Sequence, residues 1–204
     1  MQIVLSKSLK TELYRKCVHL SSLWMPLFIL LADRGGSMVL FSVLLLLNIG
    51  VEYAAYHKVA VIGGLFRRMF IKTLRNREIR RTEFVPSGSV YILAAALAVS
   101  VCFSPRAAAA AMSVMLVADS AAALVGKFFG TRRFSNGKSA EGTCAFFISA
   151  AGVIVMFFPG ISPAVLCLAA LAATAAEFYE GKIRIDDNFA IPLISGFILN
   201  LTSF

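Results

Sequence analysis

Long apolar runs, separated by short polar or glycine-rich stretches, recur along the whole chain. An apolar run of roughly 17 to 25 residues is long enough to cross a membrane as an α-helix. The pattern predicts an all-α, polytopic integral membrane protein with about seven transmembrane helices in a single domain, residues 1–204. The expected spans are residues 17–32, 38–56, 88–104, 106–128, 142–159, 162–179 and 188–204.

Composition supports the same class. The chain is 59% hydrophobic with a mean hydropathy of +0.80, which is far more apolar than soluble domains of this length. The longest polar segment runs only from about His57 to Ser87, so no separate soluble domain is expected. The four cysteines fall on separate spans without a C-x-x-C pair, and we expect packing residues rather than a disulfide framework or a metal site.

The basic residues are sorted to one side of the seven expected spans. Eighteen of the 20 Lys and Arg residues precede the first span or lie between spans two and three, four and five, or six and seven. Only Arg34 and Arg106 fall on the other side. The positive-inside rule then predicts a cytoplasmic N-terminus and a C-terminus outside. With a net charge of +9, the chain is expected to bind anionic lipid headgroups and soluble phosphates, not nucleic acid.

Four polar segments fall at the cytoplasmic ends of these spans, and we expect them to meet in one cleft. The first precedes span one, where Glu12, Arg15 and His19 are spaced to share a helix face and Lys16 lies beside them. A basic membrane anchor with an interfacial histidine is the alternative interpretation of this segment.

The second segment is in span four, where Asp119 lies within an apolar helix. A charged side chain at membrane depth costs about 2.5–3.5 kcal/mol on insertion scales, so it usually has a task or a partner. Ala122, Ala123, Gly126 and Gly130 follow close to one stripe, where nearly bare backbone admits a ligand or a neighbouring helix. The alternative is helix packing, with Asp119 paired to a basic residue.

The third segment, residues 137–143, opens span five. Ser139 is expected to be the N-cap, and free backbone N–H groups with Lys138 beside them predict a phosphate-binding helix start. The segment is not a P-loop, because that motif needs a glycine five residues before Gly137, where Arg132 stands, and a preceding strand.

The fourth segment runs from Glu177 into span seven. Asp186, Asp187 and Asn188 offer hard oxygen ligands of the kind that Mg²⁺ takes together with phosphates and water. The alternatives are that Asp187 or Asn188 caps the last helix and that Glu177 packs or pairs with a neighbour.

Together the four segments supply carboxylates for a metal, a phosphate-binding helix start and several cations at one membrane surface. This set fits phosphoryl or nucleotidyl transfer from a soluble nucleotide to a lipid, where positioning and charge neutralisation provide most of the catalysis. A small ion-coupled transporter is the alternative from another class, but it predicts polar residues at the bilayer midplane and on both sides.

The same residues resemble the CTP-dependent lipid kinase family, which includes dolichol kinase, phytol kinase and the yeast-type CTP-dependent diacylglycerol kinase and is distantly related to phosphatidate cytidylyltransferase. The resemblance extends from about Glu12 to Gly196. The motifs that carry it are Glu12-x-x-Arg15-Lys16-x-x-His19, Asp119-x-x-Ala-Ala-x-x-Gly126-x-x-x-Gly130, Lys138-Ser139-x-Glu141-Gly142, and Glu177 followed by Asp186-Asp187-Asn188 and Ile191-Pro192-Leu193.

The resemblance implies a kinase at the cytoplasmic face of a bacterial inner membrane. It would use CTP and Mg²⁺, or a similar divalent cation, to phosphorylate a lipid alcohol such as a polyprenol, diacylglycerol or a phytol-like isoprenoid. Cytidylyl transfer to phosphatidate is the alternative reaction, and the oligomeric state stays open. The implied roles are metal binding by Asp119, Asp186 and Asp187, catalysis with Lys138, Arg15 and His19, and nucleotide contacts by Lys16, Gly126, Gly130, Ser139, Glu141, Gly142, Glu177 and Asn188.

Overall fold

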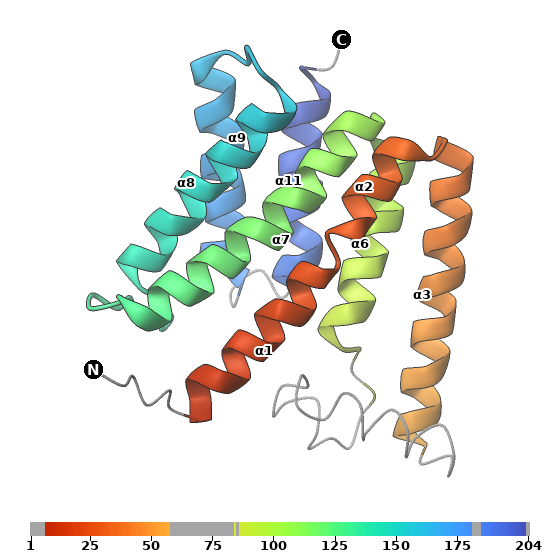
Figure 1. Ribbon diagram of the computed structural model, residues 1–204, viewed down its shortest axis with the longest axis horizontal. Coiled ribbons are helices and arrows are strands. Elements are labelled where there is room, and N and C mark those ends of the chain that lie inside the picture. The colour runs from red at the N-terminus through yellow and green to blue at the C-terminus, as the bar shows by residue number, and fades with distance from the viewer. Residues whose placement is uncertain (1–6, 58–83, 85, 181–184, 203–204) are drawn as a thin grey trace.

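A computed structural model of the protein describes residues 7–57, 84, 86–180 and 185–202, and the statements below concern these residues. The described chain is helical and contains no β-strand, which confirms the predicted all-α class. Most of the polar connection between His57 and Ser87 lies outside the described residues. The helices are α1 (Lys7–Ser21), α2 (Trp24–Leu31), α3 (Arg34–Tyr56), α6 (Gly88–Cys102), α7 (Pro105–Phe128), α8 (Ala140–Phe157), α9 (Pro163–Phe178) and α11 (Asp187–Asn200) (Figure 1).

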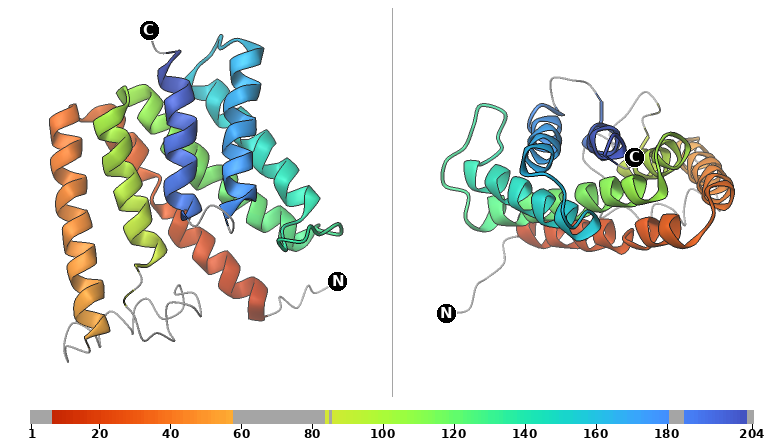
Figure 2. Two further views of the ribbon diagram at one scale, coloured as in Figure 1. Left: turned by 180° about the vertical axis from the view of Figure 1, so that it is seen from behind. Right: turned by 90° about the horizontal axis from the view of Figure 1, so that it is seen from above.

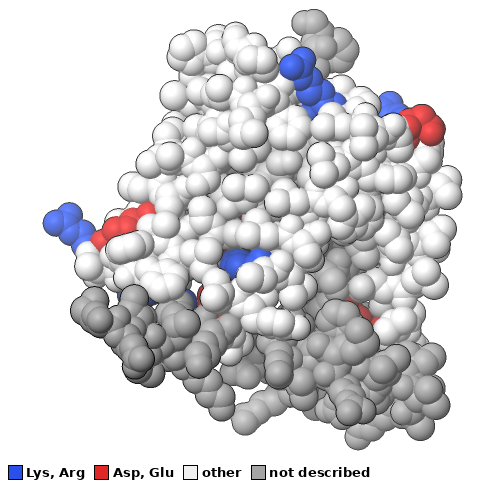
Figure 3. Space-filling view, in the orientation of Figure 1, with Lys and Arg blue, Asp and Glu red and all other residues white. Residues whose placement is uncertain are grey.

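Each expected span after the first corresponds to one helix. Three of the described helices, α3, α7 and α8, are long and apolar enough to cross a membrane, while α6 and α9 are apolar but shorter. Figure 3 shows a broad band of uncharged surface over the described residues, with charged side chains toward its upper and lower margins. These apolar helices are compatible with insertion into a membrane.

The first expected span is not one continuous helix, which corrects the prediction for residues 17–32. The break falls at Ser22 and Leu23, between α1 and α2. Pro26 has no N–H to donate to the Ser22 carbonyl, and that carbonyl accepts instead from the Met25 N–H at 2.9 Å. The Leu23 N–H likewise donates to the carbonyl three residues back, at 3.0 Å, so the chain tightens into a turn of the 3₁₀ type.

The helix α7 forms the centre of the molecule. The stretch Ala107–Met112 in its first half is fully buried, as expected for a helix segment that is apolar on all sides. The principal neighbours of α7 are α8, α11, α2 and α1, and the view from above in Figure 2 shows α7 between α1 and α2 on one side and α9 and α11 on the other. The alanine run lets these neighbours approach closely.

Arg34 and Arg106, the two basic residues expected on the other side of the membrane, donate hydrogen bonds to helix C-termini. The Arg34 side chain donates to the carbonyl of Phe103, just after α6, at 2.7 Å. Arg106 donates to the Phe157 carbonyl at the end of α8 at 2.6 Å, and its guanidinium lies 5.1 Å from the centroid of the Phe158 ring. Carbonyl groups at a helix end have no partner inside the helix, so these contacts stabilise α6 and α8.

The cysteines differ from the expectation of packing residues. All four are free, and all four are exposed on the surface of the described structure. Each is carried by a different helix: Cys17 by α1, Cys102 by α6, Cys144 by α8 and Cys167 by α9.

Candidate functional site

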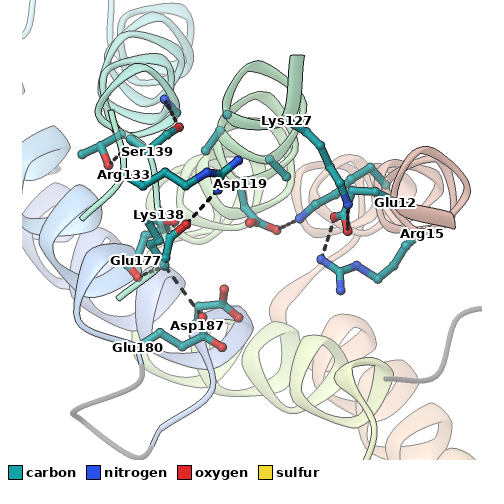
Figure 4. Close-up of a pocket in the computed structure, with 17 residues that line it drawn as sticks. Glu12, Arg15, Asp119, Lys127, Arg133, Lys138, Ser139, Glu177, Glu180 and Asp187 are labelled. Carbon is teal, nitrogen blue, oxygen red and sulfur yellow. Dashed lines mark hydrogen bonds and ion pairs between the residues drawn. The ribbon is translucent and has the colours of Figure 1, made fainter. Parts of the chain in front are cut away.

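A polar cleft of about 310 Å³ lies where α1, α7, α8, α9 and α11 meet (Figure 4). Residues from all four polar segments line it, so the prediction that these segments meet in one cleft is confirmed. The predicted site residues on its lining are Arg15, Lys16, Asp119, Gly126, Lys138, Ser139, Gly142, Glu177 and Asp187. The predicted residues outside the lining are His19, Gly130, Glu141, Asp186 and Asn188.

One side of the cleft is a buried ion pair between α1 and α7. Lys16 Nζ lies 2.5 Å from Asp119 Oδ2, with only 6% and 14% of the two side chains exposed. His19 Nε2 lies 3.4 Å from the same oxygen and has no hydrogen-bond partner among the described residues. The structure therefore gives Asp119 the basic partner that the packing alternative required. That partner is Lys16, while Arg15 pairs with Glu12 at 2.7 Å.

The opposite side carries Lys138, on the connection between α7 and α8. This connection turns at Gly137, whose φ of +83° is readily adopted only by glycine. Lys138 Nζ lies 2.7 Å from Glu177 Oε1, donates to the Glu177 carbonyl, and lies 3.7 Å from Glu180 Oε2. The other Glu177 oxygen, Oε2, is buried without a hydrogen-bond partner among the described residues. Lys138 is thus fixed between α8 and α9 with carboxylates around it.

The start of α8 confirms one prediction and corrects another. Ser139 is the N-cap, and its Oγ accepts from the Gly142 N–H at 3.1 Å. The Ala140 N–H donates to the Arg132 carbonyl at 2.9 Å. The N–H groups of Ala140 and Gly142 therefore already have partners, whereas the sequence predicted that they would be free to bind an anion. Phosphate binding at this end would depend on the Lys138 charge.

Glu141 holds the connection that precedes α8. Its Oε1 accepts from the Thr131 N–H at 3.0 Å and from the Thr131 hydroxyl. The carboxylate therefore fixes the backbone before α8, and it does not line the cleft where nucleotide contact was predicted.

The glycine stripe of α7 receives a neighbouring helix. A Cβ added to Gly126, or to Gly130 just after α7, would lie 2.8 Å from Ser139 Oγ at the start of α8. A Cβ on Gly142 of α8 would lie 2.8 Å from the Ala122 carbonyl oxygen. Of the two sequence interpretations, close approach of a helix applies at this stripe, while Ala122, Ala123 and Gly126 also line the cleft.

A cluster of three carboxylates lies where α9 ends and α11 begins. One oxygen each from Glu180, Asp186 and Asp187 lies within 4.8 Å of the others, and three hard oxygen ligands suit Mg²⁺. Asp186 is the N-cap of α11 and accepts from the Asn188 N–H at 3.1 Å, while Asp187 Oδ1 accepts from the same N–H at 3.0 Å, so both carboxylates also serve the helix start. Asp119 is not part of this cluster.

Four charged lining residues were not predicted as site residues: Glu12, Lys127, Arg133 and Glu180. The spacing of Glu177 and Glu180, three residues apart, could have indicated Glu180, because such residues share a helix face. Lys127 lies on α7 four residues after Ala123, so the same rule could have indicated it. Arg133 carries no such signal, since only the folding of the connection between α7 and α8 brings it to the cleft.

No protein-family model and no solved structure matches the chain. It is 37% identical over 94 residues to the uncharacterized protein MJ1137 of Methanocaldococcus jannaschii, over 43% of this chain and 44% of that protein. It is 30% identical over 197 residues to the uncharacterized protein RP860 of Rickettsia prowazekii, over 95% of this chain and 94% of that protein. The chain therefore belongs to the same protein family as RP860.

Proposed function

We propose that this protein is a CTP-dependent lipid kinase, which transfers the γ-phosphate of CTP to the hydroxyl group of a membrane lipid. The observation that carries the proposal is the convergence of the resembling motifs on one polar cleft beside apolar helices. Asp119, Lys138 and Asp187 come from three separate motifs, and all three line that cleft.

The charges in the cleft support phosphoryl transfer. Five basic and five acidic side chains line it. Lys138 and Lys127 have 23% and 33% of their side chains exposed, and Arg133 is exposed, so these three cations can be reached from solution. Cations in this position neutralise phosphate oxygens, and charge neutralisation provides much of the catalysis in phosphoryl transfer.

The carboxylate cluster fits a divalent cation. Glu180, Asp186 and Asp187 would hold Mg²⁺, which when bound neutralises charge on the nucleotide phosphates. Lys138 Nζ lies 3.7 Å from Glu180 Oε2, so the lysine ammonium would lie beside the bound metal ion. In this proposal Asp119 keeps the Lys16 ammonium in the cleft, and its predicted metal role is kept as a prediction.

The proposal includes a membrane arrangement. The pair α1–α2 counts as one span, seven spans cross the bacterial inner membrane, and the cleft faces the cytoplasm with the N-terminus. Figure 1 supports this arrangement, because α7 ends and α8 begins toward the lower edge of the view, where α1 also begins. Eighteen of the 20 Lys and Arg residues fall on that side in the seven-span arrangement.

The proposal is tested with purified protein in lipid nanodiscs, γ-labelled CTP, MgCl₂ and a set of lipid alcohols. We expect label in a lipid phosphate, release of CDP, and loss of transfer when EDTA removes the metal. No label on any alcohol would contradict the proposal. Transfer of α-label to phosphatidate with release of pyrophosphate would replace it with cytidylyl transfer, and equal use of ATP would contradict only the preference for CTP.

A further inference from the structure

A second cavity, of about 400 Å³, lies between α2, α3 and α6, and we call it the chain groove. Apolar side chains form most of its wall: Trp24, Met25, Leu44, Leu47, Ile92 and Leu93. Trp24 and Leu47 are 42% and 60% exposed, so the groove opens on the outer surface of the helices. Its volume is in the range of cavities that hold one small ligand.

One end of the chain groove is polar. Ser22, Asn48 and Ser89 lie on its lining. The Ser89 hydroxyl lies 3.3 Å from Asn48 Oδ1 and 3.2 Å from Oε1 of Glu52, a residue that is 6% exposed. The groove thus combines an apolar wall with a small hydrogen-bonding end, as expected for a ligand with a hydrocarbon chain and a compact polar head.

The polar end selects against an anionic head. No Lys or Arg is among the described residues that line the chain groove. The Glu52 carboxylate behind Ser89 accepts from the Ser87 N–H at 2.9 Å, and it would repel a phosphate placed at this end. A neutral hydroxyl can donate to or accept from Ser89 and Asn48 without this repulsion.

The chain groove lies close to the polar cleft at the start of α6, because a Cβ added to Gly88, the neighbour of Ser89, would lie 3.7 Å from Asn188 Nδ2, beside the cleft residue Asp187. Lys16 lines the cleft, and Ser22, six residues later, lines the groove. At a rise of 1.5 Å per residue these two positions are about 9 Å apart along the chain. The end of α3 and the start of α6, which frame the polar end, lie toward the same edge of Figure 1 as the start of α8.

We propose that the chain groove binds the hydrocarbon chain of a neutral lipid alcohol, with its hydroxyl at Asn48 and Ser89. This inference rests on the proposed function, because it identifies the groove as the binding site of the acceptor lipid. It predicts that the protein binds an alcohol in preference to the phosphatidate that cytidylyl transfer requires.

Trp24 provides a direct measurement, because it is the only tryptophan of the chain and lines the chain groove. Purified protein without nucleotide is titrated with a long-chain alcohol that carries a bromine atom on its chain, and quenching of Trp24 fluorescence is recorded. We expect saturable quenching that unlabelled geranylgeraniol or dioleoylglycerol reverses and dioleoyl phosphatidate does not. The more effective competitor then identifies an isoprenoid or a diacylglycerol acceptor.

Two adjacent leucines of α3 give matched variants. Leu47 lines the chain groove, whereas Leu46, which is 70% exposed, does not. We expect Leu47→Phe to weaken alcohol binding at least tenfold and Leu46→Phe to leave it within twofold. Quenching that does not saturate, equal effects of the two variants, or equal competition by phosphatidate would overturn the inference. Because this assay contains no CTP, saturable binding without phosphoryl transfer would instead contradict the proposed function alone.

Discussion

At the residue scale, the contact between Lys16 and Asp119 explains how a carboxylate is kept inside the central helix. Each charge alone would be costly to bury, and removing one partner of a buried pair typically costs about 3–5 kcal/mol. The sequence could not show which basic residue pairs with Asp119, because Arg15 and Lys16 point about 100° apart around α1. The rotation of α1 against α7 decides between them, and tertiary packing sets that rotation.

We predict that Asp119→Asn lowers lipid phosphorylation by at least about a hundredfold, because Lys16 would lose the carboxylate that positions it and the loss of one preorganised charge-stabilising group typically costs that much. The substitution keeps the volume but leaves Lys16 without its carboxylate. Steady-state rates with saturating CTP measure the effect, and size-exclusion chromatography checks that the variant is folded. Asp33→Asn is the matched control, since Asp33 caps α3 away from the cleft. Near-normal activity of the Asp119 variant would contradict a role in the cleft.

The carboxylate cluster gives a second prediction at this scale. Glu180→Gln removes one of three ligand oxygens, so half-maximal activity should need at least about tenfold more Mg²⁺. Glu141→Gln is the control, because Glu141 binds the backbone at Thr131 and does not line the cleft. Activity is measured over a range of MgCl₂ concentrations, and binding of Mn²⁺ is followed by electron paramagnetic resonance. An unchanged Mg²⁺ requirement in the Glu180 variant would remove this residue from the metal site.

At the element scale, direct backbone contact joins α7 to α8. Gly142 faces the Ala122 carbonyl, so these two helices cannot separate or shift without opening one wall of the cleft. The sequence indicated the glycine stripe, but it could not show whether a ligand or a neighbouring helix would pack against it. Both need small residues, and the path of the connection between α7 and α8 brings α8 against Gly126 while Ala122 and Ala123 also line the cleft.

We predict that Gly142→Ala destabilises the protein by about 1–3 kcal/mol, because the new methyl group would lie 2.8 Å from backbone that cannot yield easily. Thermal unfolding in detergent should show a lower midpoint. Gly152→Ala, on the same helix with no atom within 4 Å of the added Cβ, should leave the midpoint unchanged or slightly higher. Equal midpoints for both variants would disprove tight packing at Gly142.

The break between α1 and α2 shows another limit of periodicity at the element scale. Apolar residues continue through Pro26, so hydrophobic patterning predicted one span. Pro26 itself was the available signal, because its missing N–H interrupts the hydrogen bond to the Ser22 carbonyl. Pro192 likewise lies near the start of α11, yet that helix is continuous, so a proline alone does not decide where a span breaks. The predicted limits of the remaining spans agree with the helices to within a few residues.

At the scale of the whole molecule, the seven-span arrangement predicts that the two chain ends lie on opposite sides of the membrane. Reporter fusions at each end measure this directly: we expect a cytoplasmic reporter to be active at the N-terminus and an exported one at the C-terminus. The same reporter after Gly160, between α8 and α9, should also be exported. Both ends in one compartment would remove one span and contradict the arrangement.

The depth of the buried ion pair predicts how the proposed kinase activity responds to salt. Asp119 lies nine residues before the end of α7, or about 13 Å along the helix. Dissolved ions screen charges that they can approach, which includes Lys127 and Arg133 but not the enclosed contact between Lys16 and Asp119. Raising the ionic strength should therefore increase the KM for CTP severalfold while kcat changes little. A parallel fall in kcat would mean that ions reach the inner end of the cleft and that the membrane does not seal it.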